Sequence, residues 1–131
     1  MINPFHIGDQ KKFSKTVSAN ETARFETGEV HPFYGTFALA RDAEWSSRLF
    51  VLEMKEEDEE GIGTFVNIEH KSPAFVGDEV EFIATLTEVN KNKVNCDVEA
   101  YVGERLIAKG STGQKILKKE KIEQLKAQFN G

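Results

Sequence analysis

The sequence predicts an α+β fold in which an antiparallel sheet curls around one long central helix. Residues 33–50 form the longest apolar segment with helical periodicity, whereas apolar residues alternate with polar ones from Gly61 onward. A helix that is apolar on nearly all sides needs cover from several directions, and a sheet with one apolar face can curl around it. A short amphipathic helix is expected at the end of the chain.

The long helix is expected to run from Thr36 to about Leu52. Gly35 suits a turn, and Thr36 suits an N-cap because its hydroxyl can accept a hydrogen bond from a free amide of the first turn. Glu44 lies in the middle of this apolar segment. An ionised carboxylate loses hydration there, so it needs either a partner or a chemical role.

The segments before and after this helix are expected to be less regular. Residues 11–25 predict a short strand and a turn, and residues 26–35 predict a loop because they contain Gly28, Pro32 and Gly35. Residues 53–61 form an acidic run, which is typical of a solvated surface connection. We expect no chemistry from that run.

The remaining chain is expected to form an antiparallel meander followed by the final helix. In the first strand, the even-numbered residues from Ile62 to His70 are expected to share one face of the sheet. Tight turns are expected at residues 90–92 and 103–104. The expected strands and helix cover residues 62–70, 78–89, 94–102, 106–116 and 118–129.

Length and composition limit the classes of protein. The 131 residues fit one domain over residues 1–131, and 30% charged with 39% hydrophobic residues are typical of a globular protein. The net charge of −5 argues against a nucleic-acid partner, which needs clustered Lys and Arg. No apolar run approaches the roughly 18 residues that span a bilayer, so no membrane partner is expected.

The cysteine and histidine content bears on location and metals. The single cysteine, Cys96, rules out an intramolecular disulfide, and the N-terminus lacks the pattern of a signal peptide. We therefore expect a cytoplasmic protein. The three histidines and one cysteine have no ligand-like spacing, so no metal site is expected.

The predicted fold also indicates an assembly. A few strands around one helix leave an exposed sheet edge and an open helix flank, and pairing two copies edge to edge would cover both. A homodimer is the expected unit. A dimer of dimers is an open alternative.

Several short motifs resemble those of one protein family. Over residues 13–117 the chain resembles hotdog-fold proteins, and more closely the fluoroacetyl-CoA thioesterase group among them. The Pro-to-Gly-Asp turn is shared by many hotdog proteins and indicates the fold only. The resemblance includes Gly35-Thr36, Ala43-Glu44-Trp45, Gly63-Thr64, Asn67-Ile68-Glu69-His70, Ser72-Pro73-Ala74 and Gly77-Asp78.

This resemblance implies an active site. Thr36, Glu44 and His70 match the family's catalytic set, and Gly63 matches the glycine whose backbone amide contacts the thioester carbonyl. Coenzyme A is then part of the substrate, and no other cofactor is implied. Whether Thr36 or Glu44 attacks the carbonyl, or whether they direct a water molecule, is open.

The residue types themselves suit thioester hydrolysis. The reaction needs a base or nucleophile, a polarised carbonyl and a proton for the departing thiolate. A buried Glu and an imidazole can share the proton transfers, since burial raises the pKa of a carboxylate and a nearby carboxylate raises that of a histidine. A backbone amide at a glycine can approach an oxyanion with no side chain in the way.

Aromatic and lysine side chains are the candidates for binding the substrate. The aromatic side chains of Phe33, Tyr34 and Phe37, with Trp45, could wall a small acyl pocket or could belong to the core. For the coenzyme A phosphates, the candidates are Lys71 and Lys93, with Lys91 and Lys115 as further possibilities.

Structural interpretations compete with the catalytic ones. Thr36 can simply cap the helix, and Glu44 can form an ion pair with Arg41 or Arg48. His70 can be an ordinary hydrogen-bonded histidine at a strand end.

The same holds for other residues. Gly63 can mark a bulge or close packing. Cys96 falls on the apolar face of its strand, so a core position is expected for it. His6 and His31 have no partner at a telling spacing and are expected at the surface.

The predicted function is hydrolysis of a short or compact acyl-CoA to the free acid and coenzyme A. The alternative is a non-catalytic module that binds CoA esters or another apolar ligand in the same groove, and a purely structural dimer is a further alternative. A hotdog dehydratase is disfavoured, since no Asp and His pair has the spacing that such enzymes use beside the helix start.

Overall fold

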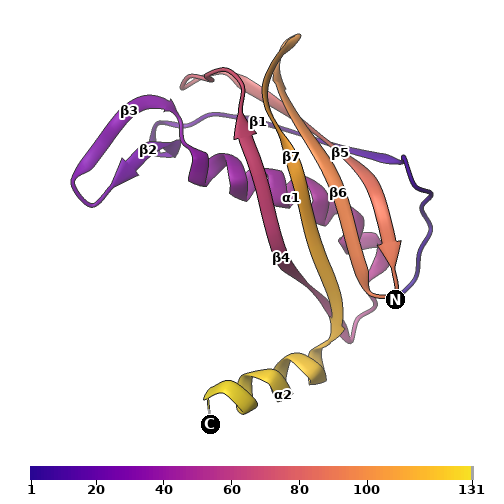
Figure 1. Cartoon of the computed structure of the whole chain (residues 1–131). Helices are drawn as coiled ribbons and strands as arrows, with labels where there is room; N and C mark the ends of the chain where they lie inside the picture. The colour runs from indigo at the N-terminus through magenta and orange to yellow at the C-terminus, as the bar shows by residue number, and fades with distance from the viewer. Residues whose placement is uncertain (131) are drawn as a thin grey trace.

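A curved antiparallel sheet wraps around one long helix, α1 (Thr36–Met54), in a computed structural model that describes residues 1–130 (Figure 1). The five strands lie in the order β1-β5-β6-β7-β4, so β1 and β4 form the two edges of the sheet. All neighbouring strands are antiparallel. The strands are β1 (Gln10–Thr16), β4 (Glu59–His70), β5 (Glu79–Asn90), β6 (Lys93–Val102) and β7 (Arg105–Lys118).

The core lies between α1 and the concave face of the sheet. The alternation expected in β5 and β6 is confirmed. The even-numbered residues 80–86 of β5 and 94–100 of β6 point inward and are buried. On α1, Leu39, Ala43 and Phe50 are fully buried against them. Burial of apolar surface on both elements stabilises this packing.

The prediction of a loop over residues 26–35 was wrong. After the short helix η1 (Ala19–Glu21), strands β2 (Thr22–Phe25) and β3 (Gly28–Tyr34) form a separate two-stranded hairpin. Gly28 makes the turn possible because its φ of +113° suits glycine. Pro32 lacks an N–H group, which a two-stranded ribbon with register shifts tolerates. The hairpin projects beyond the N-terminal end of α1 (Figure 1).

The predicted face of β4 was wrong for the residues before Thr64, because the strand contains a bulge. Its pairing with β7 shifts between Gly63 and Phe65, so that Thr64 is an extra residue in the ladder. A bulge adds one residue to one strand and therefore reverses which alternate residues face inward. Gly61 and Gly63 face α1 before the bulge, whereas Ile68 packs against the core after it.

The acidic connection is shorter than expected, because α1 continues to Met54 and β4 already begins at Glu59. Glu59 is buried, and Glu60 pairs with Arg48 at 2.5 Å. Only the residues between the two elements form the solvated turn that the acidic run predicts.

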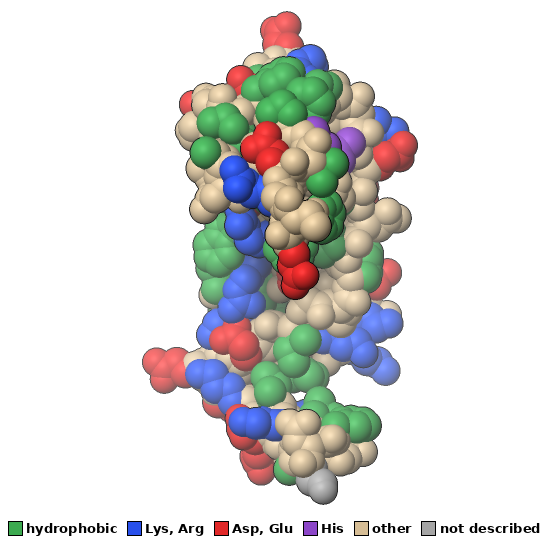
Figure 2. All heavy atoms as spheres, turned by 90° about the vertical axis from the view of Figure 1, so that its left-hand side faces the viewer, with side chains coloured by type: hydrophobic (Ala, Val, Ile, Leu, Met, Phe, Trp, Pro, Cys, Tyr) green, Lys and Arg blue, Asp and Glu red, His purple; other side chains and the backbone are tan. Residues whose placement is uncertain are grey.

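The last helix, α2 (Lys119–Asn130), was predicted within one residue at each end. It extends from the end of β7, and none of its residues is buried. Figure 1 shows it at the lower end of the molecule, and Figure 2 shows hydrophobic side chains at the surface there. Within the described residues, no helix is long and apolar enough to span a bilayer.

Candidate active site

Thr36 and His70 meet at the N-terminal end of α1. His70 Nε2 lies 3.1 Å from Thr36 Oγ1, within hydrogen-bond distance. Thr36 is not the N-cap, as the sequence suggested, because the extended residue Gly35 takes that position and accepts a hydrogen bond from the Leu39 N–H group. The threonine hydroxyl is therefore free of the capping role and can interact with the imidazole.

The chain around Gly35 is held from several sides. The Gly35 N–H group donates to the Glu21 carbonyl oxygen at 2.8 Å, and the Tyr34 N–H group donates to the Ala74 carbonyl oxygen at 2.9 Å. The buried Tyr34 hydroxyl donates to Asp42 on α1. These contacts fix the direction in which Thr36 leaves the hairpin.

Charged groups surround this junction. Glu21 and Asp42 are buried, and both pair with Arg41 and Lys15. Burial opposes ionisation of Glu21, but hydrogen bonds from Lys15, the backbone of Ser18 and Arg41 outweigh it and lower the pKa of Glu21 to about 2. Glu21 therefore stays ionised at neutral pH.

Glu44 lies against Gly63. It follows Thr36 by about two helical turns, which places both on the same side of α1. A Cβ atom added to Gly63 would collide with Glu44 Oε1, so only glycine leaves room for this carboxylate. The side chain of Glu44 is half-buried.

The predicted ion pairs of Glu44 with Arg41 or Arg48 do not form. Arg41 pairs with Glu21 and Asp42, while Arg48 donates to the carboxylate of Glu60. Among residues 1–130, Glu44 has neither a hydrogen bond nor an ion pair through its side chain. A half-buried carboxylate of this kind is available to a reacting group.

His70 shares its surroundings with a second histidine, the half-buried His31, which the sequence predicted at the surface without a partner. Burial lowers the pKa of His70 below its ordinary value, and the proximity of His31 lowers it further. The imidazole is therefore neutral near pH 7 and can accept a proton. His31 comes from β3, and only the hairpin fold brings it close, so spacing along the chain gave no sign of it.

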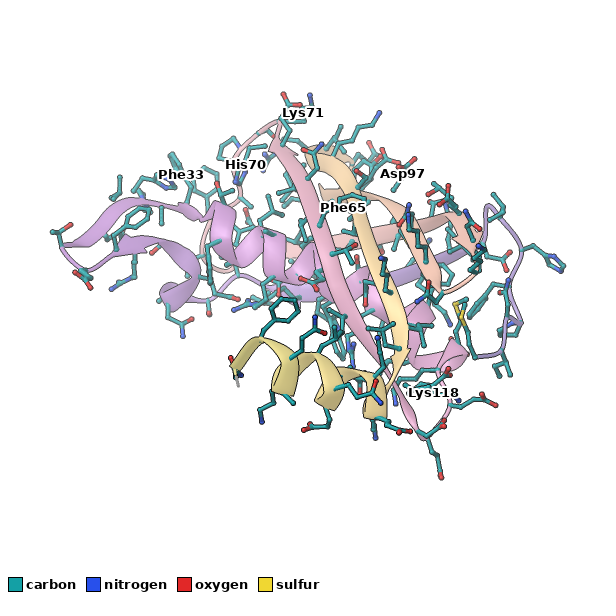
Figure 3. The ribbon with its side chains drawn as sticks, turned by 60° about the horizontal axis from the view of Figure 1, so that its bottom comes forward. Phe33, Phe65, His70, Lys71, Asp97 and Lys118 are labelled. Carbon is teal, nitrogen blue, oxygen red and sulfur yellow. The ribbon has the colours of Figure 1, made fainter. Side chains whose placement is uncertain are left out.

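A pocket of about 350 Å³ opens beside Thr36 and His70. Three predicted substrate-binding residues, Phe33, Tyr34 and Lys71, line it, although Tyr34 is almost fully buried. Figure 3 shows Phe33, His70 and Lys71 at one end of the molecule, near the start of α1. The lining residues are His31, Phe33, Tyr34, Thr36, His70, Lys71, Ser72 and Pro73.

Other predicted residues lie elsewhere. Phe37 is 89% exposed and lines a neighbouring hollow under the hairpin, which His31 and Thr36 also line. Lys93 lies with Lys115 in a hollow beside Phe65, on the outer face of the sheet. Trp45 faces a different hollow. None of these residues lines the pocket that Thr36 shares with His70.

Cys96 is a core residue, as expected. It is 1% exposed, and burial raises the pKa of its thiol to about 12. A thiol in this environment stays protonated and is not a nucleophile.

A sheet curled around a central helix, with this set of polar residues at the helix, defines a hotdog-fold thioesterase. Residues 17–120 match the model of the family described as fluoroacetyl-CoA-specific thioesterase. The chain belongs to this family and is a thioester hydrolase.

Solved structures agree with this assignment. A thioesterase superfamily member from Thermus thermophilus is 36% identical, with 98% of this chain and 96% of that chain covered and a TM-score of 0.93. The fluoroacetyl-CoA thioesterase FlK is 20% identical, with 96% of this chain and 98% of that chain covered and a TM-score of 0.87.

A hot-dog-like protein from Thermanaerovibrio acidaminovorans is 22% identical, with 97% of this chain and 94% of that chain covered and a TM-score of 0.87. The likenesses to this protein and to FlK show the fold. No curated protein matches the sequence.

Proposed function

We propose that the chain hydrolyses a short or otherwise compact acyl-CoA to the free acid and coenzyme A, with Thr36, Glu44, His70 and Gly63 at the reacting centre. The observation that supports this most directly is the 3.1 Å contact between Thr36 and His70 at a pocket of about 350 Å³. A pocket of this size suits a small acyl group.

The residues at the reacting centre have different roles in the hydrolysis. A water molecule or Thr36 attacks the thioester carbonyl carbon, while His70 or Glu44 accepts the proton that is released. The backbone amide of Gly63 stabilises the negative charge that develops on the carbonyl oxygen. Collapse of the intermediate breaks the carbon–sulfur bond, and the departing thiolate takes up a proton to give coenzyme A. If Thr36 attacks, water then hydrolyses the acyl-enzyme.

Glu44 is also a candidate nucleophile. Its carboxylate is free of other partners in the described chain and is close to Gly63, where the carbonyl oxygen is expected. Attack by Glu44 would give an anhydride that water then opens. No cofactor beyond the coenzyme A part of the substrate is needed in any of these routes.

The proposal includes a homodimer. The edge strand β4 exposes Ile62 and Phe65, and α1 exposes Trp45 and Leu52. Unpaired edge strands and exposed apolar side chains favour association, and a second copy paired along β4 would cover this edge. A dimer of dimers and a cytoplasmic location stay predictions from the sequence.

Thiol release from a panel of acyl-CoA esters tests the proposal. Short esters are expected to turn over with kcat/KM well above that of long-chain esters, because the pocket is small. Saturable binding of acyl-CoA without thiol release would contradict catalysis and would instead support the binding module.

A further inference from the structure

We propose that the pocket beside Thr36 and His70 selects acyl groups that end in a free carboxylate, so that the substrate is the monothioester of coenzyme A with a short dicarboxylic acid. This inference rests on the proposed thioesterase function and specifies the substrate class of that same site.

The first observation is the character of the pocket wall. Three basic side chains, His31, His70 and Lys71, line it, and among residues 1–130 no carboxylate does. Figure 2 shows histidine side chains gathered beside hydrophobic ones near the top of one face. The whole chain carries a net charge of −5, so this local composition departs from the average of the molecule. An anionic group would find the ammonium group of Lys71 and imidazole N–H donors here.

His31 is oriented as a hydrogen-bond donor. Its Nδ1 accepts a hydrogen bond from the Phe33 N–H group at 3.2 Å, so the proton of the neutral ring is on Nε2. The ring also packs against Phe33, with 5.2 Å between the ring centroids. This packing limits the ring's freedom and favours a preformed donor.

Lys71 and Arg105 add positive charge. Lys71 Nζ lies 3.2 Å from Glu69, but both side chains are exposed, and such pairs are weak enough to exchange partners. Arg105 donates to Ser72 Oγ at 2.8 Å and to the Pro73 carbonyl oxygen. Ser72 and Pro73 are part of the pocket wall, so the guanidinium lies directly behind it.

The anionic group that fits this pocket is a carboxylate of the acyl group, on the opposite side of the thioester from the coenzyme A phosphates. Thr36 and His70, which the proposed function places at the reacting centre, are themselves part of the wall. The phosphates of coenzyme A lie a whole pantetheine arm away from the thioester carbonyl. A pocket of about 350 Å³ that adjoins the reacting groups Thr36 and His70 is therefore within reach of the acyl group and not of the phosphates.

The test compares malonyl-CoA with isovaleryl-CoA, in which an isopropyl group replaces the carboxylate with little change in shape. We expect kcat/KM to favour malonyl-CoA at least tenfold. Lys71→Met and His31→Phe are each expected to reduce this ratio at least threefold, mainly by lowering kcat/KM for malonyl-CoA. The matched controls Lys12→Met and His6→Phe lie at exposed positions outside the pocket and should leave the ratio unchanged.

A second arm distinguishes the acyl carboxylate from the phosphates. Malonyl and isovaleryl thioesters of N-acetylcysteamine lack phosphates, so the same ratio is expected with them. A preference seen only with the CoA esters would overturn the inference, as would a ratio of one or below. Turnover of isovaleryl-CoA would still support the thioesterase in both cases, whereas no turnover of any ester would contradict the proposed function itself.

Discussion

At the site, Gly63 allows the carboxylate of Glu44 to lie close to the backbone of β4. A Cβ atom at this position would collide with Glu44 Oε1. We expect Gly63→Ala to displace the carboxylate and to lower kcat/KM by about 10²-fold, in the range typical of a lost catalytic interaction. Circular dichroism and thermal unfolding would show whether the variant is folded.

A second substitution tests the cause of that loss. Glu44→Asp shortens the side chain by one methylene group and makes room for the added methyl group, so the double variant should be more active than Gly63→Ala alone. Full activity of Gly63→Ala would contradict the role given to the glycine.

The pH dependence of turnover follows from His70. Burial and the nearby His31 hold its pKa below the ordinary value of 6.5. If the neutral imidazole acts as the base, kcat/KM for isovaleryl-CoA should fall only as the pH drops below about 6.5. Removing a neighbouring positive charge favours protonation of His70, so His31→Phe should move this fall to higher pH. A fall centred above pH 6.5 in the wild type would contradict the account.

Between elements, the junction of β3 and α1 determines where Thr36 lies. The Tyr34 hydroxyl donates to the buried Asp42, so Tyr34→Phe leaves this carboxylate without one donor. We expect a loss of about 1–3 kcal/mol in the free energy of unfolding, measured by urea denaturation. Tyr101→Phe is the matched control, because its hydroxyl donates to the half-buried Glu99 on the sheet surface. Equal losses in both variants would argue against a special role for Tyr34.

Regular elements were predictable from the sequence, and irregular ones were not. The alternation of β5 and β6 and the helical period of α1 follow from one-dimensional patterns that each element satisfies alone. The bulge at Thr64 has no such pattern. By parity along the chain, Gly63 and His70 would face opposite sides of β4, and only the extra residue brings both to α1.

The lining of the pocket was likewise only partly predictable from the sequence. Thr36, Glu44, Gly63 and His70 were proposed from their likeness to a family, and the structure places them in two contacting pairs. The contribution of His31 depends on the hairpin, whose sequence predicts a loop because glycine and proline interrupt the strand pattern. Tertiary packing overrode that local signal.

At the scale of the whole molecule, the exposed edge of β4 predicts self-association. Sedimentation equilibrium should give about twice the chain mass of 14.7 kDa. Ile62→Lys places a charge on the exposed edge and should shift the mass toward the monomer. Ile7→Lys makes the same change at an exposed residue outside the sheet and should leave the mass unchanged. A monomeric wild type would contradict the proposed dimer.

The most direct test of the central claim is the kcat/KM of Glu44→Gln and His70→Ala on the acyl-CoA that the wild type hydrolyses fastest. Each variant should lose at least about 10²-fold while remaining folded, because each removes a group that takes part in the proton transfers. The matched controls Glu53→Gln and His6→Ala alter exposed residues and should retain wild-type turnover. Folded Glu44→Gln and His70→Ala variants with nearly full activity would contradict the claim that these residues form the active site.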